Sequence, residues 1–168
     1  YFSGNNGLSG QTLWKTDGTL NGTEKVATIN EDGLNVPAYT GRSGVSLKTF
    51  ANKGGTTVFS IENAAGELWK TDGELNNTVK IGDAEDFSGI RIGELFPLDN
   101  NGLILAFSGN EGNLFHLDES LSTITELTPV SGKVDLLGAT VNGKYIFPSD
   151  VNLFGVGKEP YVTDGTIG

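Results

Sequence analysis

Residues 13–23 read LWKTDGTLNGT, and residues 68–78 repeat this pattern as LWKTDGELNNT. A degenerate copy begins at Leu114 and keeps the aromatic residue Phe115 and the aspartate Asp118. A shortened copy spans residues 160–166. The aromatic residues of the four copies stand at positions 14, 69, 115 and 161, which are 55, 46 and 46 residues apart. Self-similarity of this kind indicates a chain built from one repeated supersecondary unit.

A second motif, centred on phenylalanine, precedes each aromatic residue by 8 to 14 residues, at 1–7, 58–63, 106–112 and 146–150. Further β-rich runs lie before this motif at 45–50, 90–98 and 134–141, and after the aspartate motif at 24–29, 79–81 and 124–127. No window shows an apolar helical face, and 25 glycines punctuate the chain at hairpin spacing. The sequence therefore predicts an all-β chain. We name the strands of each unit A, B (the phenylalanine motif), C (the aromatic residue before the aspartate) and D, in chain order.

Four short antiparallel strands in each unit match the blade of a β-propeller, whose common repeat classes have a period of roughly 40 to 50 residues. A β-sandwich does not need self-similarity at this period, and a β-helix uses much shorter rungs. We divide the single propeller segment, residues 1–168, into units 1–33 (B, C, D), 34–88 (A to D), 89–132 (A to D) and 133–168 (A, B, C). Two full blades flanked by two incomplete ones predict a segment of a larger propeller, or a protomer completed by other copies.

The repeat resembles a bacterial repeat family written E-L-W-x-[ST]-D-G-T-x-x-G-T, which is found in large secreted or surface proteins and is believed to form β-propellers. Residues 67–78 and 12–23 match this pattern closely, residues 160–166 are truncated, and residues 114–123 depart from it by losing Gly and Thr. The aspartate motif also resembles the Asp-box hairpin of other propellers, which usually lies away from the ligand site. The resemblance implies a propeller architecture and a bacterial, extracellular or cell-surface setting, and it implies no particular activity.

The composition excludes several classes of function. Lys and Arg number 11 against 21 Asp and Glu, so the formal net charge of -10 repels phosphate backbones, and we expect no nucleic-acid partner. The absence of Cys and the single histidine, His116, exclude disulfides, thiolate zinc sites and histidine metal clusters. No apolar run approaches the roughly 20 residues of a membrane span, so we expect no membrane insertion.

Asp-Gly pairs are predicted to close the turns between strands C and D. An aspartate accepts hydrogen bonds from backbone N–H groups two residues on, and a glycine adopts a positive φ without steric cost. These structural turn residues are Asp17, Gly18, Asp72, Gly73, Asp164 and Gly165. Calcium is the alternative, but a calcium loop needs about 6 to 8 oxygen ligands, more than the residues after each aspartate supply. We therefore expect no cofactor.

One aromatic residue in strand B and one in strand C recur in every unit. Because these positions recur where the faces of blades must pack, we expect them to be buried in the blade core, and a platform for stacking sugars is the alternative. The blade-core residues are Phe2, Trp14, Phe59, Trp69, Phe107, Phe115, Phe147 and Tyr161.

Successive connections of an up-and-down meander alternate between its two edges. The B-to-C and D-to-A loops therefore share one edge, which we name the loop rim. The A-to-B and C-to-D connections share the opposite edge, which we name the turn rim. We expect the ligand contact face on the loop rim, with solvated surface as the alternative. Its polar residues are Asn5, Asn6, Asp32, Glu62, Asn63, Asp83, Glu85, Asp86, Asn110, Glu111 and Asp150.

These observations predict a non-enzymatic, extracellular or cell-surface β-propeller scaffold and binding module. Its expected partners are glycans or proteins, and other blades of the same parent chain or other copies. One alternative is a hydrolase or lyase that uses rim carboxylates such as Asp83, Glu85 or Asp86, since glycoside hydrolysis needs two carboxyls about 5 to 9.5 Å apart. The other alternative is a self-assembling surface-layer or filament component, whose incomplete end blades pair with other copies.

Overall fold

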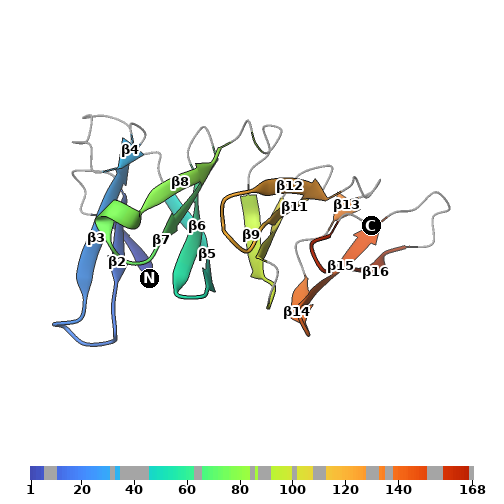
Figure 1. The fold of residues 1–168 in the computed structure, drawn as a ribbon, viewed down its shortest axis with the longest axis horizontal. Helices are drawn as coiled ribbons and strands as arrows, with labels where there is room; N and C mark the ends of the chain where they lie inside the picture. Colours follow the sequence, from blue (N-terminus) through green and yellow to red (C-terminus); the bar gives the residue numbers. More distant parts are fainter. Residues whose placement is uncertain are drawn as a thin grey trace.

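The computed structural model describes residues 1–5, 11–30, 33–34, 46–62, 66–83, 86, 92–99, 102–107, 113–127, 133–134, 138–150 and 157–166. In these ranges the regular structure is β-strand, apart from one short 3-10 turn, η1 (Leu75–Asn77). The strands form four antiparallel sheets, and Figure 1 shows the sheets following one another along the long axis of the molecule. The prediction of an all-β chain is confirmed. Among the described residues, the structure has no helix of the length and hydropathy that crossing a bilayer requires.

The first sheet contains the predicted strands B, C and D of the first unit. These are β1 (Phe2–Asn5), β2 (Gln11–Lys15) and β3 (Glu24–Asn30), and the strand order follows the chain. The sequence analysis did not predict the fourth strand, β4 (Gly33–Leu34), which pairs with β3 through two residues.

The second and third sheets are complete four-stranded meanders, as the sequence predicted. The second sheet consists of β5 (Ser46–Lys53), β6 (Thr56–Glu62), β7 (Glu67–Thr71) and β8 (Val79–Gly82). The third sheet consists of β9 (Ile92–Pro97), β10 (Leu103–Phe107), β11 (Leu114–Leu117) and β12 (Ile124–Leu127).

In the fourth sheet, two short strands, β13 (Lys133–Val134) and β14 (Ala139–Val141), take the place of a continuous strand A. They are followed by β15 (Lys144–Asp150) and β16 (Glu159–Thr163). Ser149 pairs with Glu159 of β16 on one side and with Val134 of β13 on the other, so β13 lies along the same edge of β15 as β14. The predicted strand at residues 134–141 is therefore interrupted, and the sheet has the predicted order A, B, C.

The pairing register separates the two rims. In the second sheet, Ser46 pairs with Glu62 at the loop rim, whereas Lys53 pairs with Thr56 at the turn rim. Strands C and D turn at this second edge too, since Lys70 pairs with Val79. The rims thus follow from the meander, because each strand reverses direction relative to its neighbour.

Equivalent aromatic residues face each other across strands B and C. Phe2 pairs with Trp14, Phe59 with Trp69, and Phe147 with Tyr161. In the third sheet the partner of Phe115 is Leu105, so Leu105 holds the position that the sequence analysis assigned to Phe107. The reason is the register, because Phe107 lies beyond the last paired residue of β10 on the β11 side.

Each sheet turns its two faces to different neighbours. We name the face that carries the cross-strand pair with the aromatic residue the leading face, and the opposite face the trailing face. In the second sheet, Phe59 and Trp69 pack from the leading face against Leu13 and Ala27 of the first sheet. The trailing face packs its Val58 and Leu68 against the third sheet, in the cluster that contains Leu105 and Phe115.

The third and fourth sheets meet in the same way. The trailing face of the third sheet contributes Ile104 and Leu114, and the leading face of the fourth sheet contributes Tyr145 and Phe147. The rings of Tyr145 and Phe147 stack with their centres 5.3 Å apart. All three internal interfaces therefore join one trailing face to the next leading face. Each fully buried aliphatic or aromatic side chain in them contributes about 1.5 to 3 kcal/mol.

The blade-core prediction therefore has different outcomes at different positions. Phe59, Trp69, Phe115 and Phe147 are buried, and Trp14 and Tyr161 are half-buried. For Phe2 the prediction is wrong, because 41% of its side chain is exposed. Phe2 lies on the leading face of the first sheet, and no described sheet packs against that face.

Candidate functional site

The structure describes only part of the predicted contact face on the loop rim. Asn5, Glu62 and Asp150 are the last residues of β1, β6 and β15, which places their backbone at this rim. Asp83 and Asp86 follow β8 at the same rim. The remaining predicted residues lie outside the described ranges; they are Asn6, Asp32, Asn63, Glu85, Asn110 and Glu111.

The described carboxylates of the loop rim form local contacts. The Asp86 carboxylate accepts a hydrogen bond of 2.9 Å from the backbone N–H of Asp83, and Asp83 itself lies 3.2 Å from Lys80 Nζ. Lys80 also lies 3.7 Å from Glu67, whose carboxylate accepts a 3.0 Å hydrogen bond from the indole N–H of Trp69. The hydrogen bond with Asp83, aided by the charges of both carboxylates, raises the pKa of Lys80.

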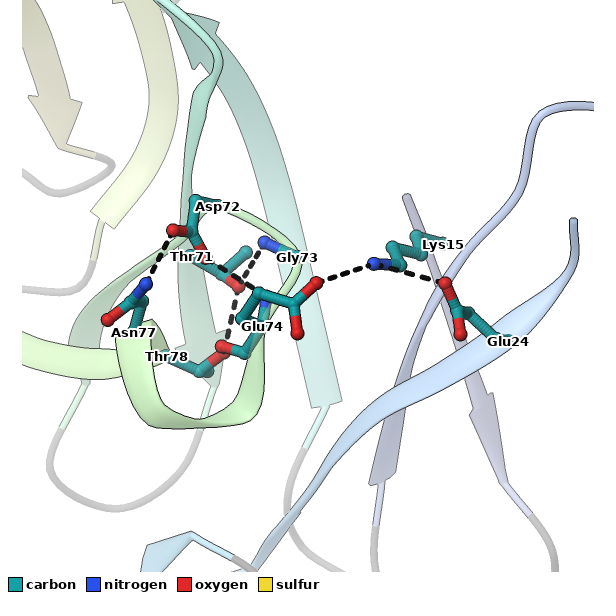
Figure 2. A network of polar contacts seen from close by, with 8 residues as sticks. All are labelled: Lys15, Glu24, Thr71, Asp72, Gly73, Glu74, Asn77 and Thr78. Atoms are coloured by element: carbon teal, nitrogen blue, oxygen red, sulfur yellow. Dashed lines mark hydrogen bonds and ion pairs between the residues drawn. The ribbon is translucent and has the colours of Figure 1, made fainter.

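Among the residues that the structure describes, the turn rim contains the more extensive polar network, which Figure 2 shows for the second sheet. The Thr71 hydroxyl accepts a 3.0 Å hydrogen bond from the Gly73 N–H and lies 2.8 Å from the Thr78 hydroxyl. Asp72 accepts hydrogen bonds from the Glu74 N–H at 3.0 Å and from the Asn77 amide at 2.6 Å. The repeated threonines and the aspartate therefore satisfy the backbone of their own turn.

The first and fourth sheets use the same bonds. Thr16 accepts from the Gly18 N–H at 3.0 Å, and Asp17 accepts from the Thr19 N–H at 2.9 Å. In the fourth sheet, the Gly165 N–H donates to Thr163 at 3.1 Å and the Thr166 N–H donates to Asp164 at 3.0 Å. The glycines that follow the aspartates, Gly18, Gly73 and Gly165, have φ values of 92, 101 and 89°, in the left-handed region that favours glycine.

The third sheet reaches a similar turn with a different sequence. Asp118 accepts hydrogen bonds from the Ser120 hydroxyl at 2.6 Å and from the N–H groups of Ser122 and Thr123, both at 2.9 Å. Leu121, three residues after Asp118, takes the left-handed conformation with φ of 54°, whereas in the other turns the glycine directly after the aspartate has a positive φ. The degenerate copy of the motif therefore keeps the function of the aspartate while losing the Asp-Gly pair.

These hydrogen bonds shift the pKa values of the turn carboxylates. Bonds from Thr19, from the Glu74 N–H and from Thr166 lower the pKa values of Asp17, Asp72 and Asp164, respectively. Desolvation opposes ionisation of Asp118, but the hydrogen bonds from Ser120, Ser122 and Thr123 outweigh it and lower the pKa to about 2. Across the described ranges, no three acidic or histidine side chains gather closely enough to hold a metal ion.

The turn rim also joins one sheet to the next. Lys15, which follows Trp14 in the first sheet, lies 3.1 Å from Glu24 of its own sheet and 3.2 Å from Glu74 in the turn of the second sheet (Figure 2). The equivalent lysine of the second sheet, Lys70, donates a 2.9 Å hydrogen bond to the carbonyl of Leu121 in the turn of the third sheet. Each lysine therefore connects its strand C to the following turn.

A cleft of about 500 Å³ lies on the turn rim between the second and third sheets. Its walls include Lys53 and Lys70, which donate to backbone carbonyls of the third sheet, those of Leu98 and Asp99 for Lys53 and that of Leu121 for Lys70. Polar side chains complete the lining, among them Asp72, Asn76, Asn77, Glu119 and Ser120. Amides, carboxylates and hydroxyls of this kind can hydrogen-bond a polar ligand such as a sugar.

Sequence reasoning missed the inter-sheet lysines, the paired threonines and Glu67. A signal was present for the lysines and the threonines, because Lys15 and Lys70 both follow the tryptophan, and Thr16–Thr23 and Thr71–Thr78 have the same spacing. Glu67 had no such signal, since the first copy has Thr12 at its position. His116, the single histidine of the chain, is half-buried in β11. Comparison with family models, with curated proteins and with solved structures finds no match to the chain.

Proposed function

We propose that the chain is a β-propeller segment that acts as a non-enzymatic scaffold and binding module. The observation that carries the proposal is the internal interface, which occurs three times with the same order of faces. The A strands also contact one another, β5 with β9 and β9 with β14, and Thr49 of β5 donates a 2.8 Å hydrogen bond to the Gly93 carbonyl of β9. Adjacent A strands are what blades radiating from one axis require.

The described carboxylates support a structural role. The turn aspartates accept hydrogen bonds from their own backbone, Asp86 accepts one from Asp83, and Asp83 is paired with Lys80. The alternative, a hydrolase with paired rim carboxylates, would use residues such as Asp83, Asp86 or Glu85, of which Glu85 lies outside the described ranges. The bacterial, extracellular or cell-surface setting rests on the resemblance of the repeat.

We place the main contact surface on the loop rim and a second one in the cleft of the turn rim. Both surfaces offer carboxylates and amides, which suit the hydroxyls of a glycan or the polar groups of a protein surface. The cleft has the advantage of a concave shape between two sheets. The loop rim has the advantage that its loops differ in sequence from unit to unit.

A binding experiment with two matched double variants tests this proposal. Bacterial polysaccharides are immobilised, and binding of the wild type is compared with Asp83→Asn/Asp86→Asn on the loop rim and Asn76→Ala/Glu119→Gln in the cleft. We expect the loop-rim variant to lose most of its binding and the cleft variant to lose a smaller part, and the reverse result would make the cleft the main contact surface. Release of reducing sugar by the wild type, lost in Asp83→Asn/Asp86→Asn, would contradict the scaffold and favour the enzyme.

A further inference from the structure

The leading face of the first sheet exposes aromatic side chains. Phe2 is 41% exposed, Trp14 is half-buried, and their rings stack with centres 6.3 Å apart. The equivalent residues of the second sheet, Phe59 and Trp69, are only 0% and 6% exposed because the first sheet covers them. The aromatic pair of the first sheet is thus built like an interface, with its covering sheet absent from the described residues.

The trailing face of the fourth sheet exposes aliphatic side chains. Ile146 and Val162 pair across β15 and β16 and are 40% and 59% exposed, and Val141 on the same face is 49% exposed. Ile104 of the third sheet, at the position equivalent to Ile146, is fully buried beneath the fourth sheet. This face therefore presents the aliphatic half of the same type of interface.

We propose that the leading face of the first sheet packs on the trailing face of the fourth sheet of a second copy of the chain. Phe2 and Trp14 would lie against Ile146 and Val162, as Phe147 and Tyr145 lie against the third sheet inside the chain. The new interface continues the three internal ones, since each of those joins a trailing face to a leading face. The inference deepens the proposed scaffold role by naming a partner.

The geometry favours a second copy over closure of one chain on itself. Figure 1 shows the first and fourth sheets at opposite ends of the row, with the second and third sheets between them. Pairing of two identical faces is disfavoured too, because none of the internal interfaces joins two leading or two trailing faces. An interface between unlike faces is heterologous and generates rings or filaments. The net charge of -10 opposes contact between copies, so moderate salt should strengthen it.

The experiment measures the mass of the 168-residue chain by size-exclusion chromatography with light scattering over a range of concentrations and salt. We expect the mass of the wild type to rise above 17.7 kDa with concentration. Phe2→Glu blocks the leading end face and Val162→Glu blocks the trailing end face, so each variant alone should be a monomer, with association at least about tenfold weaker. Leu20→Glu, at a 91% exposed residue outside both faces, is the matched control and should associate like the wild type.

Mixing the two blocked variants gives the decisive result. Phe2→Glu keeps an open trailing face and Val162→Glu keeps an open leading face, so the mixture should form a dimer that grows no further. A wild type that stays monomeric at all concentrations would overturn the inference, as would dimers of either variant alone. Circular dichroism confirms that each variant is folded. A monomeric wild type that still binds polysaccharide would leave the proposed scaffold function in place.

Discussion

At the scale of single residues, the repeated motif is best understood as a set of partners for turn backbone groups. Thr71 and Thr78 are 0% and 1% exposed, and together they satisfy the Gly73 N–H and the Glu74 carbonyl. The corresponding threonines of the first sheet, Thr16 and Thr23, make the same bonds closer to solvent. The two threonine pairs make the same hydrogen bonds but differ in burial. Comparing them therefore measures how much burial changes the contribution of these bonds to the unfolding free energy.

Replacing Thr71 by Val should therefore destabilise the protein more than replacing Thr16 by Val. The Thr71→Val variant leaves the buried Gly73 N–H without its acceptor, which costs about 1 to 3 kcal/mol of unfolding free energy. In the Thr16→Val variant water can replace the lost hydroxyl, so the cost should stay below about 1 kcal/mol. Urea denaturation of both variants provides the measurement, and equal losses would contradict the assigned role of burial.

Asp118 should give the protein part of its acid sensitivity. Its pKa is about 2 in the folded chain against an ordinary value of 3.8, so the ionised group stabilises the fold above about pH 4. This contribution is lost as the pH falls from about 4 through about 2. The unfolding free energy of Asp118→Asn should therefore depend less on pH in this window than that of the wild type.

The matched control for Asp118→Asn is Glu119→Gln, which removes an exposed carboxylate from the same turn. Its unfolding free energy should follow the wild-type pH dependence between pH 2 and 5. Should Asp118→Asn do the same, the hydrogen bonds from Ser120, Ser122 and Thr123 would not control the acid response.

At the scale of strands and turns, much of the arrangement follows from the sequence. The position of the Asp-Gly pairs after strand C predicts a hairpin, because local hydrogen bonds of the aspartate and the positive φ of glycine are sufficient to form it. The pairing register of the strands is harder to predict from the sequence. The Phe-Ser dipeptide at Phe107 resembles that at Phe59, and this resemblance predicts that Phe107 faces Phe115. Instead Leu105 faces Phe115. The spacing of ten residues between paired positions is the same in both sheets, Phe59–Trp69 and Leu105–Phe115, so the spacing follows the register where the dipeptide does not.

Contacts between sheets are the part that the local pattern did not reveal. Lys70 contacts a backbone carbonyl in the turn of the next sheet. Every residue has such a carbonyl, so the sequence does not indicate which one the lysine contacts. Of the candidate site, the sequence placed the two rims correctly through strand alternation. It gave no indication of the cleft, because its walls come from the second and third sheets together.

The two inter-sheet lysines should differ in their contribution to stability. The Lys70→Met variant loses the charged group that donates a half-buried hydrogen bond to the Leu121 carbonyl. This loss should cost about 1.5 to 3 kcal/mol of unfolding free energy. Lys15→Met removes ion pairs with exposed Glu24 and Glu74, and its effect should be smaller and should fade in 1 M salt. Denaturation at low and high salt tests both variants, and a strong salt dependence for Lys70→Met would be the contrary outcome.

At the scale of the whole molecule, the sheets behave as a one-dimensional stack. Only the second and third sheets are covered on both faces by described sheets, and three hydrophobic clusters occupy the boundaries between neighbours. Stability in such a stack is approximately a sum of single-sheet terms and nearest-neighbour terms. The exposure of Phe2 shows why equivalence within the repeat did not predict burial, since burial depends on a neighbour.

Hydrogen exchange should therefore vary along the stack. Backbone amides of β6, β7, β10 and β11 should exchange most slowly, and those of β1 and β16 should exchange fastest, because the end sheets open with one interface broken instead of two. Mass spectrometry of peptides from deuterated protein gives the order. Uniform protection of all four sheets would mean that the molecule unfolds as a single cooperative unit.

The constant order of faces also has a genetic consequence. Recombination between the similar segments at residues 13–23 and 68–78 would delete or duplicate one whole repeat. In the deletion product β8 would replace β3 as the last strand of the fused sheet, and its trailing face, with Leu13 or the equivalent Leu68, would again meet the leading face with Leu105 and Phe115. Insertions and deletions of complete repeats are thus compatible with folding, and the number of repeats is a property that evolution can change in single steps.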